Sequence, residues 1–88
     1  MHEKELEKTC KAVANQRRLK ILKILKARDE MNVTEIAREL QLSFTATSRH
    51  LLILERSGIL EKEQRDLNVF YRLAQYLPPF ILKLCAEL

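Results

Sequence analysis

Glycine and proline are scarce in this sequence, with one glycine and two prolines among 88 residues. Because these residues form most tight turns, their scarcity predicts few turns and much helix. No apolar run approaches the roughly 20 residues that a membrane-spanning helix needs. The segment up to Lys11 is charged throughout, which argues against a secretory signal. We therefore expect a single domain, residues 1–88, located in the cytoplasm and not in a membrane.

Catalytic motifs are missing as well. The sequence has no glycine-rich phosphate loop, no paired carboxylates that suggest a pocket, and only two histidines, His2 and His50. No cysteine and histidine form a convincing pair of nucleophile and base, since His50 and the two cysteines lie on separate predicted elements. We expect no enzyme activity and no cofactor.

Cysteine occurs only twice, at Cys10 and Cys85, which excludes a disulfide-stapled scaffold. In a cytosolic protein both thiols should be reduced. Cys10 lies at helical spacing from Leu6 and Val13, and Cys85 is spaced similarly from other apolar residues of the C-terminal segment. One interpretation is that both are small buried hydrophobic residues. The other is that they form a redox-responsive pair.

The net charge of +4 and the isoelectric point of about 9.3 permit a polyanionic partner without requiring one. Residues 1–30 contain nine Lys and Arg against five Asp and Glu, whereas residues 43–73 contain five against four. The basic excess therefore lies mainly in the first third of the chain.

Hydrophobic periodicity predicts helices over residues 3–14 and from Asn15 to about residue 27, the second apolar over more than half of its circumference. Residues 28–33 are predicted to be a loop that admits a short strand at 31–33. Either Asn32 or Thr34 can cap a third helix ending near residue 40. A turn at 41–43 follows, and then a helix capped by Ser43, running to residue 57 and stopped by Gly58. Two helices joined by a tight turn form a helix-turn-helix arrangement.

Beyond Gly58 the period changes to that of strands, over residues 59–64 and 68–73, with a charged tip between them. At this tip Asp66 and Asn68 are the residues best suited to a positive φ. Pro78 and Pro79 are suited to start a last helix that reaches residue 88. The predicted fold is mainly α with a small β-hairpin, in the order helix, helix, short strand, helix, helix, strand, strand, helix.

The helix after the turn has two different sides when placed on a wheel at about 100° per residue. The inner side consists of apolar and partly polar residues: Thr47, His50, Leu51 and Leu54. The outer side consists of Phe44, Thr45, Ser48, Arg49 and Leu52. Short hydroxyl side chains and an arginine near a helix N-terminus suit contact with base edges in the DNA major groove. An ordinary surface helix with a serine cap is the alternative.

Residues 13–73 resemble the ArsR-type (arsenical-resistance repressor) winged helix-turn-helix regulators. The matching segments are VANQRRLKIL, VTEIARELQLS, TSRHLLILERSGIL and VFYRL. The resemblance implies a homodimeric repressor that binds a near-palindromic site on double-stranded DNA and dimerises through residues 3–14 and 78–88. Helix 43–57 would enter the major groove and the wing, residues 59–73, would lie near the minor groove. By position, the residues facing bases would be Phe44, Thr45, Ser48 and Arg49, and those facing phosphate would be Lys62 and Arg65.

The sequence departs from the family pattern at four positions. Phe44 stands where a polar residue is frequent, Thr47 where valine is usual, Leu52 where a basic residue is common, and Asp66 where the wing has glycine. These departures imply weaker electrostatic attachment to DNA or an unusual operator.

Family metal sites are not matched either. The positions of the family's thiolate ligands hold Asn32 and Thr34, and the last helix has no histidine. A site built on His2 and Cys10 would need further ligands, so we expect no metal. Some family members respond to oxidants, which keeps Cys10 and Cys85 as a redox alternative. A winged helix that only docks another protein, through Phe44 and Leu52, is the alternative to DNA binding.

Overall fold

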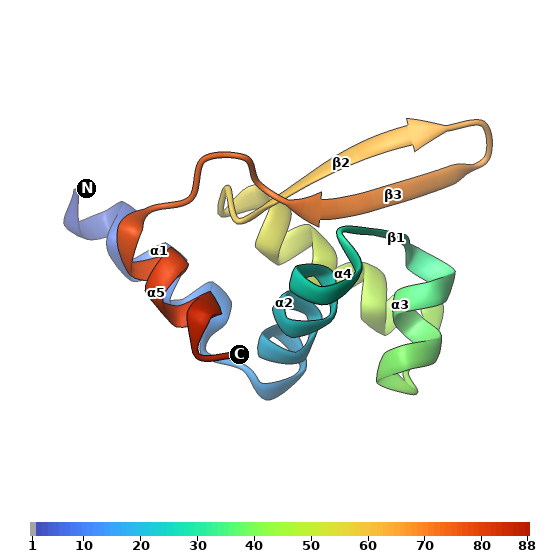
Figure 1. Cartoon of the computed structure of the whole chain (residues 1–88), viewed down its shortest axis with the longest axis horizontal. Coiled ribbons are helices and arrows are strands. Elements are labelled where there is room, and N and C mark those ends of the chain that lie inside the picture. Colours follow the sequence, from blue (N-terminus) through green and yellow to red (C-terminus); the bar gives the residue numbers. More distant parts are fainter. Residues whose placement is uncertain (1) are drawn as a thin grey trace.

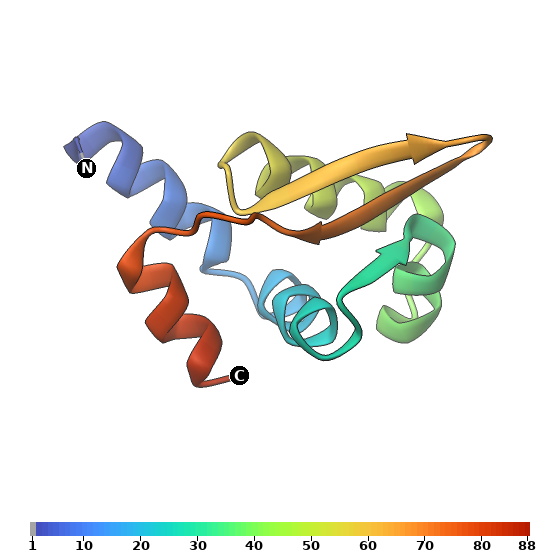
Figure 2. The same cartoon turned by 45° about the horizontal axis from the view of Figure 1, so that its top comes forward.

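The computed structural model describes residues 2–88, which fold into five helices and a three-stranded antiparallel sheet (Figure 1). The elements are α1 (Glu3–Val13), α2 (Gln16–Arg28), β1 (Glu30–Asn32), α3 (Val33–Leu40), α4 (Phe44–Arg56), β2 (Leu60–Arg65), β3 (Asn68–Leu73) and α5 (Pro79–Ala86). Their order is the predicted one. The hairpin of β2 and β3 projects from the helices as a wing, as Figure 2 shows from a second direction.

Polar side chains begin four of the helices, α1 to α4, by accepting hydrogen bonds from free backbone N–H groups. Asn15 Oδ1 accepts from the N–H groups of Arg17 and Arg18 at the start of α2. Asn32, not Thr34, caps α3, and it exchanges bonds of 2.8 and 2.9 Å with Glu35 in a capping box. Such caps contribute about 1 kcal/mol each. The capping residues Asn15 and Asn32 explain why the starts of α2 and α3 could be predicted from the sequence.

Helix α2 lies at the centre of the hydrophobic core, as its wide apolar surface predicted. Its residues Ile21, Leu22 and Leu25 are essentially inaccessible to solvent. They belong to one cluster with apolar residues of every other helix and of the sheet. Burying each such side chain contributes about 1.5–3 kcal/mol relative to exposure. The core is therefore built around α2, and the other helices take their positions from it.

The turn between α3 and α4 depends on one residue in a left-handed conformation. Gln41 has φ 56° and ψ 43°, and the N–H of Leu42 donates to the carbonyl of Ala37 at 3.1 Å. This arrangement ends α3 and reverses the chain within three residues, so that α4 can start at Phe44. The turn was predicted at 41–43, but the positive φ of Gln41 was not.

The sheet has the order β1-β3-β2 and extends the predicted hairpin by one strand. Strand β1 is Glu30–Asn32, so the predicted bounds of 31–33 were one residue late, because Val33 already belongs to α3. Arg65 pairs with Asn68, which leaves a tip of two residues. Asp66 takes the positive φ, 55°, as predicted, whereas Asn68 is a paired strand residue.

The terminal helices and the wing tip lie at opposite ends of the longest dimension, which is 36 Å. In both views α1 and α5 occupy the end away from the tip (Figures 1 and 2). Helix α5 ends at Ala86 and directs Ile81 and Cys85 into the core. Surfaces on the terminal helices and surfaces on the wing are thus well separated.

A small polar group lies buried where α2 meets α4. His50 Nδ1, Thr47 Oγ1 and Arg18 Nε are inaccessible and have no hydrogen-bond partner among residues 2–88. Burial lowers the pKa of His50, and the nearby charges of Arg18 and Arg17 lower it further. His50 is therefore the packed histidine that its place on the inner side predicted, and it favours the neutral form.

Acidification should destabilise the protein through His50. The pKa of His50 is lower in the folded state than in the unfolded state. The contribution of His50 to the free energy of unfolding is therefore fully present above its ordinary pKa of about 6.5. It is lost as the pH falls through the pKa of the folded state. We expect the urea midpoint to fall more for the unsubstituted protein than for His50→Gln between about pH 7.5 and about pH 5.5. Parallel pH profiles for the two proteins would show that His50 does not carry the effect.

Candidate nucleic-acid interface

The N-terminal half of α4 presents the side chains that the sequence assigned to its outer face. Phe44 is 59% exposed, Thr45 and Arg49 are exposed, and Ser48 and Leu52 are half-buried. On the opposite side Thr47, Leu51 and Leu54 are completely buried and His50 is half-buried. The division into two sides is therefore confirmed. Contact of the outer residues with DNA stays a prediction.

The N-terminus of α4 keeps its positive electrostatic character. Ser43 Oγ accepts from the N–H of Ala46 at 3.0 Å, and the first turn contains no acidic residue. By contrast, α1 and α3 have glutamates in their first turns. The partial positive charge of the helix dipole at this end favours an anion, and phosphate is a suitable one.

Lys62 does not stand free on the wing. Its ammonium lies 3.4 Å from Glu55 Oε1 of α4. In the sheet register Lys62 is opposite Tyr71, whose side chain is buried against the core and whose pKa is raised by that burial. This ion pair connects the root of the wing to the last turn of α4.

Arg65 is also held within the wing. Its guanidinium forms an ion pair and hydrogen bond with Glu30 of β1 and lies 3.6 Å from Glu63 Oε2. The guanidinium carbon stands 4.0 Å from the centroid of the Phe70 ring. The hydrogen bond to Glu30 is the main reason that the pKa of Arg65 is raised. Sequence reasoning missed Glu30 and Glu55, because the pairing of β1 with β3 brings Glu30 to the wing and the packing of α4 against β2 brings Glu55 there.

The two cysteines have different surroundings. Cys85 is buried, and burial raises the pKa of its thiol, although the charge of Lys26 opposes this. Cys10 is exposed. In the single chain, therefore, the interpretation of both as buried hydrophobic residues holds for Cys85 and is wrong for Cys10.

No three His, Cys, Asp or Glu side chains between residues 2 and 88 come close enough together to hold a metal ion. Asn32 serves as the cap of α3, and Thr34 is an exposed residue of its first turn. In the same part of the chain, none of the helices has the length and apolar character that crossing a bilayer needs.

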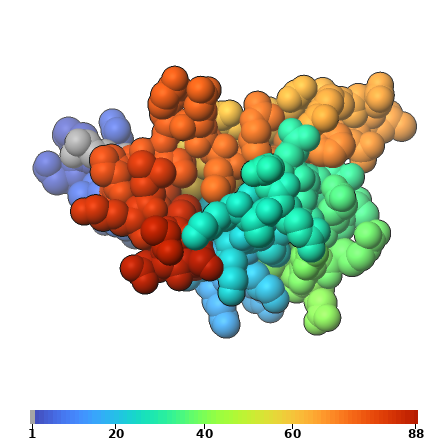
Figure 3. Space-filling model, in the orientation of Figure 1, coloured from blue at the N-terminus to red at the C-terminus, as the bar shows by residue number. Residues whose placement is uncertain are grey.

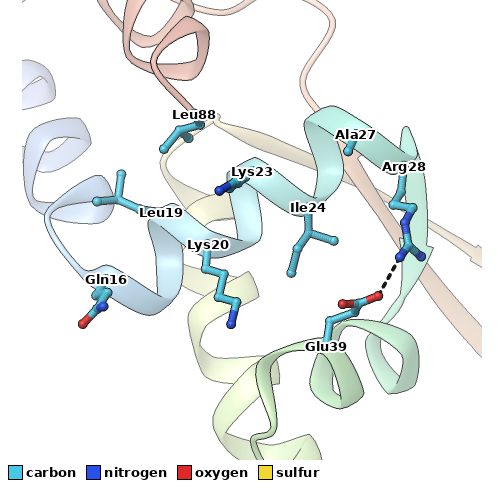
Figure 4. A pocket seen from close by; sticks show the side chains of 9 residues that line it. All are labelled: Gln16, Leu19, Lys20, Lys23, Ile24, Ala27, Arg28, Glu39 and Leu88. Atoms are coloured by element: carbon cyan, nitrogen blue, oxygen red, sulfur yellow. Dashed lines mark hydrogen bonds and ion pairs between the residues drawn. The ribbon is translucent and has the colours of Figure 1, made fainter.

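A groove of about 470 Å³ lies beside α2, away from the outer face of α4 (Figure 4). Apolar side chains of Leu19, Ile24 and Leu88 contribute to its lining, and Lys20 and Lys23 stand among them. The ion pair of Arg28 with Glu39, at 2.8 Å, lies at one end. The groove contains none of the residues predicted to contact DNA.

The chain is similar to curated proteins that include two transcription regulators. The transcriptional activator HlyU of Vibrio cholerae is 42% identical over 64 residues, which are 73% of this chain and 58% of HlyU. The arsenical resistance operon repressor of Escherichia coli is 32% identical over 77 residues, which are 88% of this chain and 66% of the repressor. The chain thus spans less than two thirds of the length of either relative.

Solved structures agree with the fold along nearly the whole chain. HlyU of Vibrio cholerae superposes with a TM-score of 0.81 at 31% identity, covering 99% of this chain and 92% of that one. A homodimeric winged helix-turn-helix DNA-binding domain of Mycobacterium bovis gives 0.80 at 31% identity, covering 96% and 74%. Residues 15–62, more than half of the chain, match the family model described as bacterial regulatory protein, arsR family. The chain belongs to the arsR family of bacterial regulatory proteins, as its residue pattern predicted.

Proposed function

We propose that this chain is a sequence-specific DNA-binding transcriptional regulator that acts in the cytoplasm as a homodimeric repressor, without catalytic activity. The observation that supports this most directly is the outer face of α4. It presents Thr45, Ser48 and Arg49 on a helix whose opposite side is fixed in the core. The two curated relatives regulate in opposite directions. Repression requires only that an operator be occupied, which is why we favour it.

Base reading would fall to the first two turns of α4. The major groove is wide enough for a helix, and short hydroxyl side chains there can donate to or accept from base edges. Arg49 is exposed, and none of the ion pairs found among residues 2–88 involves it. A free guanidinium is suited to two hydrogen bonds with one guanine. Phe44 would contact a thymine methyl group, and the wing would lie near the minor groove.

Dimerisation would use residues 3–14 and 78–88. This end of the molecule exposes apolar side chains at Leu6, Tyr76 and Leu82, and the segment between β3 and α5 stands out from the surface in Figure 3. The Mycobacterium bovis relative is homodimeric. With dimer contacts at this end, both recognition helices would stay free to enter major grooves about one helical turn apart on a near-palindromic site.

Docking of a protein through Phe44 and Leu52 is the weaker alternative. Leu52 is half-buried, so the outer face exposes only Phe44 as a large apolar residue. The relatives named above are regulators or a DNA-binding domain. Salt distinguishes the two functions, because binding to phosphates weakens steeply as salt is raised and apolar docking does not.

Replacing Arg49 tests the base contact. We expect Arg49→Ala to lose about 1–3 kcal/mol of binding on the preferred sequence, and to lose discrimination at a single base pair of each half-site. Fluorescence anisotropy across a salt series, on DNA selected from a random pool and on single-base variants of it, measures both. Arg56→Ala is the control, since Arg56 is exposed in the last turn of the same helix. An equal loss on every sequence would mean that Arg49 contacts only phosphate.

Replacing Leu82 tests the dimer. Leu82 is 56% exposed on α5, and a charge there should weaken self-association about tenfold or more if the side chain is buried between subunits. Sedimentation velocity should show monomers for Leu82→Glu and dimers for Leu67→Glu, since Leu67 is 98% exposed at the wing tip. A dimer that tolerates Leu82→Glu would place the interface elsewhere.

The alternative interpretation of Cys10 and Cys85 as a redox-responsive pair requires both thiols to react. Because Cys85 is buried and its thiol pKa is raised, we expect it to react with a thiol reagent at least about tenfold more slowly than Cys10 in the native protein. Mass spectrometry after timed alkylation measures each rate, and Cys10→Ser should abolish the fast one. Equal rates would show that the C-terminal helix opens readily enough for Cys85 to take part.

A further inference from the structure

Charged side chains gather on the outer face of the three-stranded sheet. In one cross-strand row Glu30 of β1 is opposite Arg72 of β3, which is opposite Glu61 of β2. The next row toward the tip contains Phe70 and Glu63, and the last contains Arg65. Since side chains alternate between the two faces of a sheet, all of these share the face opposite to buried Met31 and Tyr71.

Arg65 reaches backward along this face. It stands directly before the tip, two rows farther out than Glu30, yet its guanidinium is bonded to the Glu30 carboxylate. On the way it passes over the Phe70 ring, at 4.0 Å, and lies 3.6 Å from Glu63. The side chain is therefore retracted from the tip toward the body of the molecule.

All three basic side chains of the two wing strands are occupied in this way. Lys62 is paired with Glu55, and Arg72 lies 3.3–3.6 Å from carboxylates of Glu30, Glu61 and Glu63. The tip itself carries the acidic Asp66. Within residues 59–73 the wing as folded offers no uncompensated cation to a phosphate. The sequence had predicted that Arg65 faces a DNA phosphate, but in this structure its charge is already paired with carboxylates.

We propose that Glu30 is a positioning residue that restrains Arg65 in the retracted conformation, and that a DNA phosphate competes with Glu30 for the guanidinium. The proposal rests on the DNA-binding function proposed above. On binding, Arg65 swings toward the tip and exchanges a carboxylate for a phosphate. The side chains of Arg65 and Glu30 are 44% and 33% exposed, and pairs so accessible to water are weak enough to be exchanged.

Glu30 differs from Glu63 in where it is anchored. Glu63 lies two residues before Arg65 on β2 and moves with the wing, whereas Glu30 lies on β1, three residues before α3 begins. The contact with Glu30 therefore ties the wing arginine to the helix-turn-helix itself. The Glu30–Arg65 contact therefore determines how much the wing adds to DNA affinity, and it leaves the base-contacting residues of α4 unchanged.

The test compares operator binding by the unsubstituted dimer with binding by Glu30→Gln. Removing the charge releases Arg65 from β1 and leaves it only the contact with Glu63 on its own strand. We expect binding about three- to tenfold tighter from the loss of one exposed ion pair in each subunit. The dependence on salt should also steepen, because more counterions are released when Arg65 no longer arrives already paired. Fluorescence anisotropy measures both, with circular dichroism to verify that each variant is folded.

Two further variants make the result specific. Glu61→Gln removes a carboxylate from the same face that pairs with Arg72 and not with Arg65, so it should give a smaller gain. In an Arg65→Ala background, Glu30→Gln should give no gain. Equal gains from the Glu30 and Glu61 variants, a gain that survives without Arg65, or no gain at all would overturn the proposal. If the unsubstituted protein still binds DNA selectively, such a result overturns only the role of Glu30 and not the proposed DNA-binding function. If the unsubstituted protein does not bind DNA selectively, both the function and the role of Glu30 are overturned.

Discussion

The burial of one side of α4 against the core is the constraint on which the rest of the molecule depends. Leu51 and Leu54 are completely enclosed, together with Ile21 and Leu22 of α2. Two fully buried side chains on consecutive turns fix the rotation of a helix about its axis. That rotation turns Thr45 and Arg49 outward, so a purely hydrophobic requirement selects the polar surface that is offered to a partner.

Electrostatics acts differently at the two parts of the candidate interface. At the start of α4 the helix dipole is opposed by no acidic residue, and Arg49 is exposed. On the wing, by contrast, both arginines lie 3.3–3.6 Å from glutamate carboxylates, and Arg65 is also bonded to Glu30. The net charge of +4 therefore says little about where phosphate would be attracted, since charge that is already paired contributes little. The distribution suits a protein that relies on α4 for recognition and uses the wing as an adjustable contact.

Helix ends and turns could be predicted from the sequence where one side chain or one glycine is enough to favour them. Asn15 and Ser43 cap helices, Gly58 ends α4 with φ 76°, and Asp66 takes a positive φ, as the sequence predicted. Gln41 was not recognised as a left-handed residue, because nothing in its side chain favours that conformation. Its backbone is held there by the packing of α3 against α4, which outweighs a cost of about 1–2 kcal/mol.

By itself the sequence determined the number and order of the elements, the two sides of α4 and the membership of a regulator family. Periodicity, caps and turn residues act within a few positions of the chain, so each can be recognised without knowing the fold. Only the tertiary structure decided that Glu30 and Glu55 hold the wing cations, that Cys10 is exposed while Cys85 is buried, and that β1 joins the hairpin. These outcomes depend on strand register and helix packing, which bring together residues that are distant in the chain, such as Glu30 and Arg65, 35 positions apart.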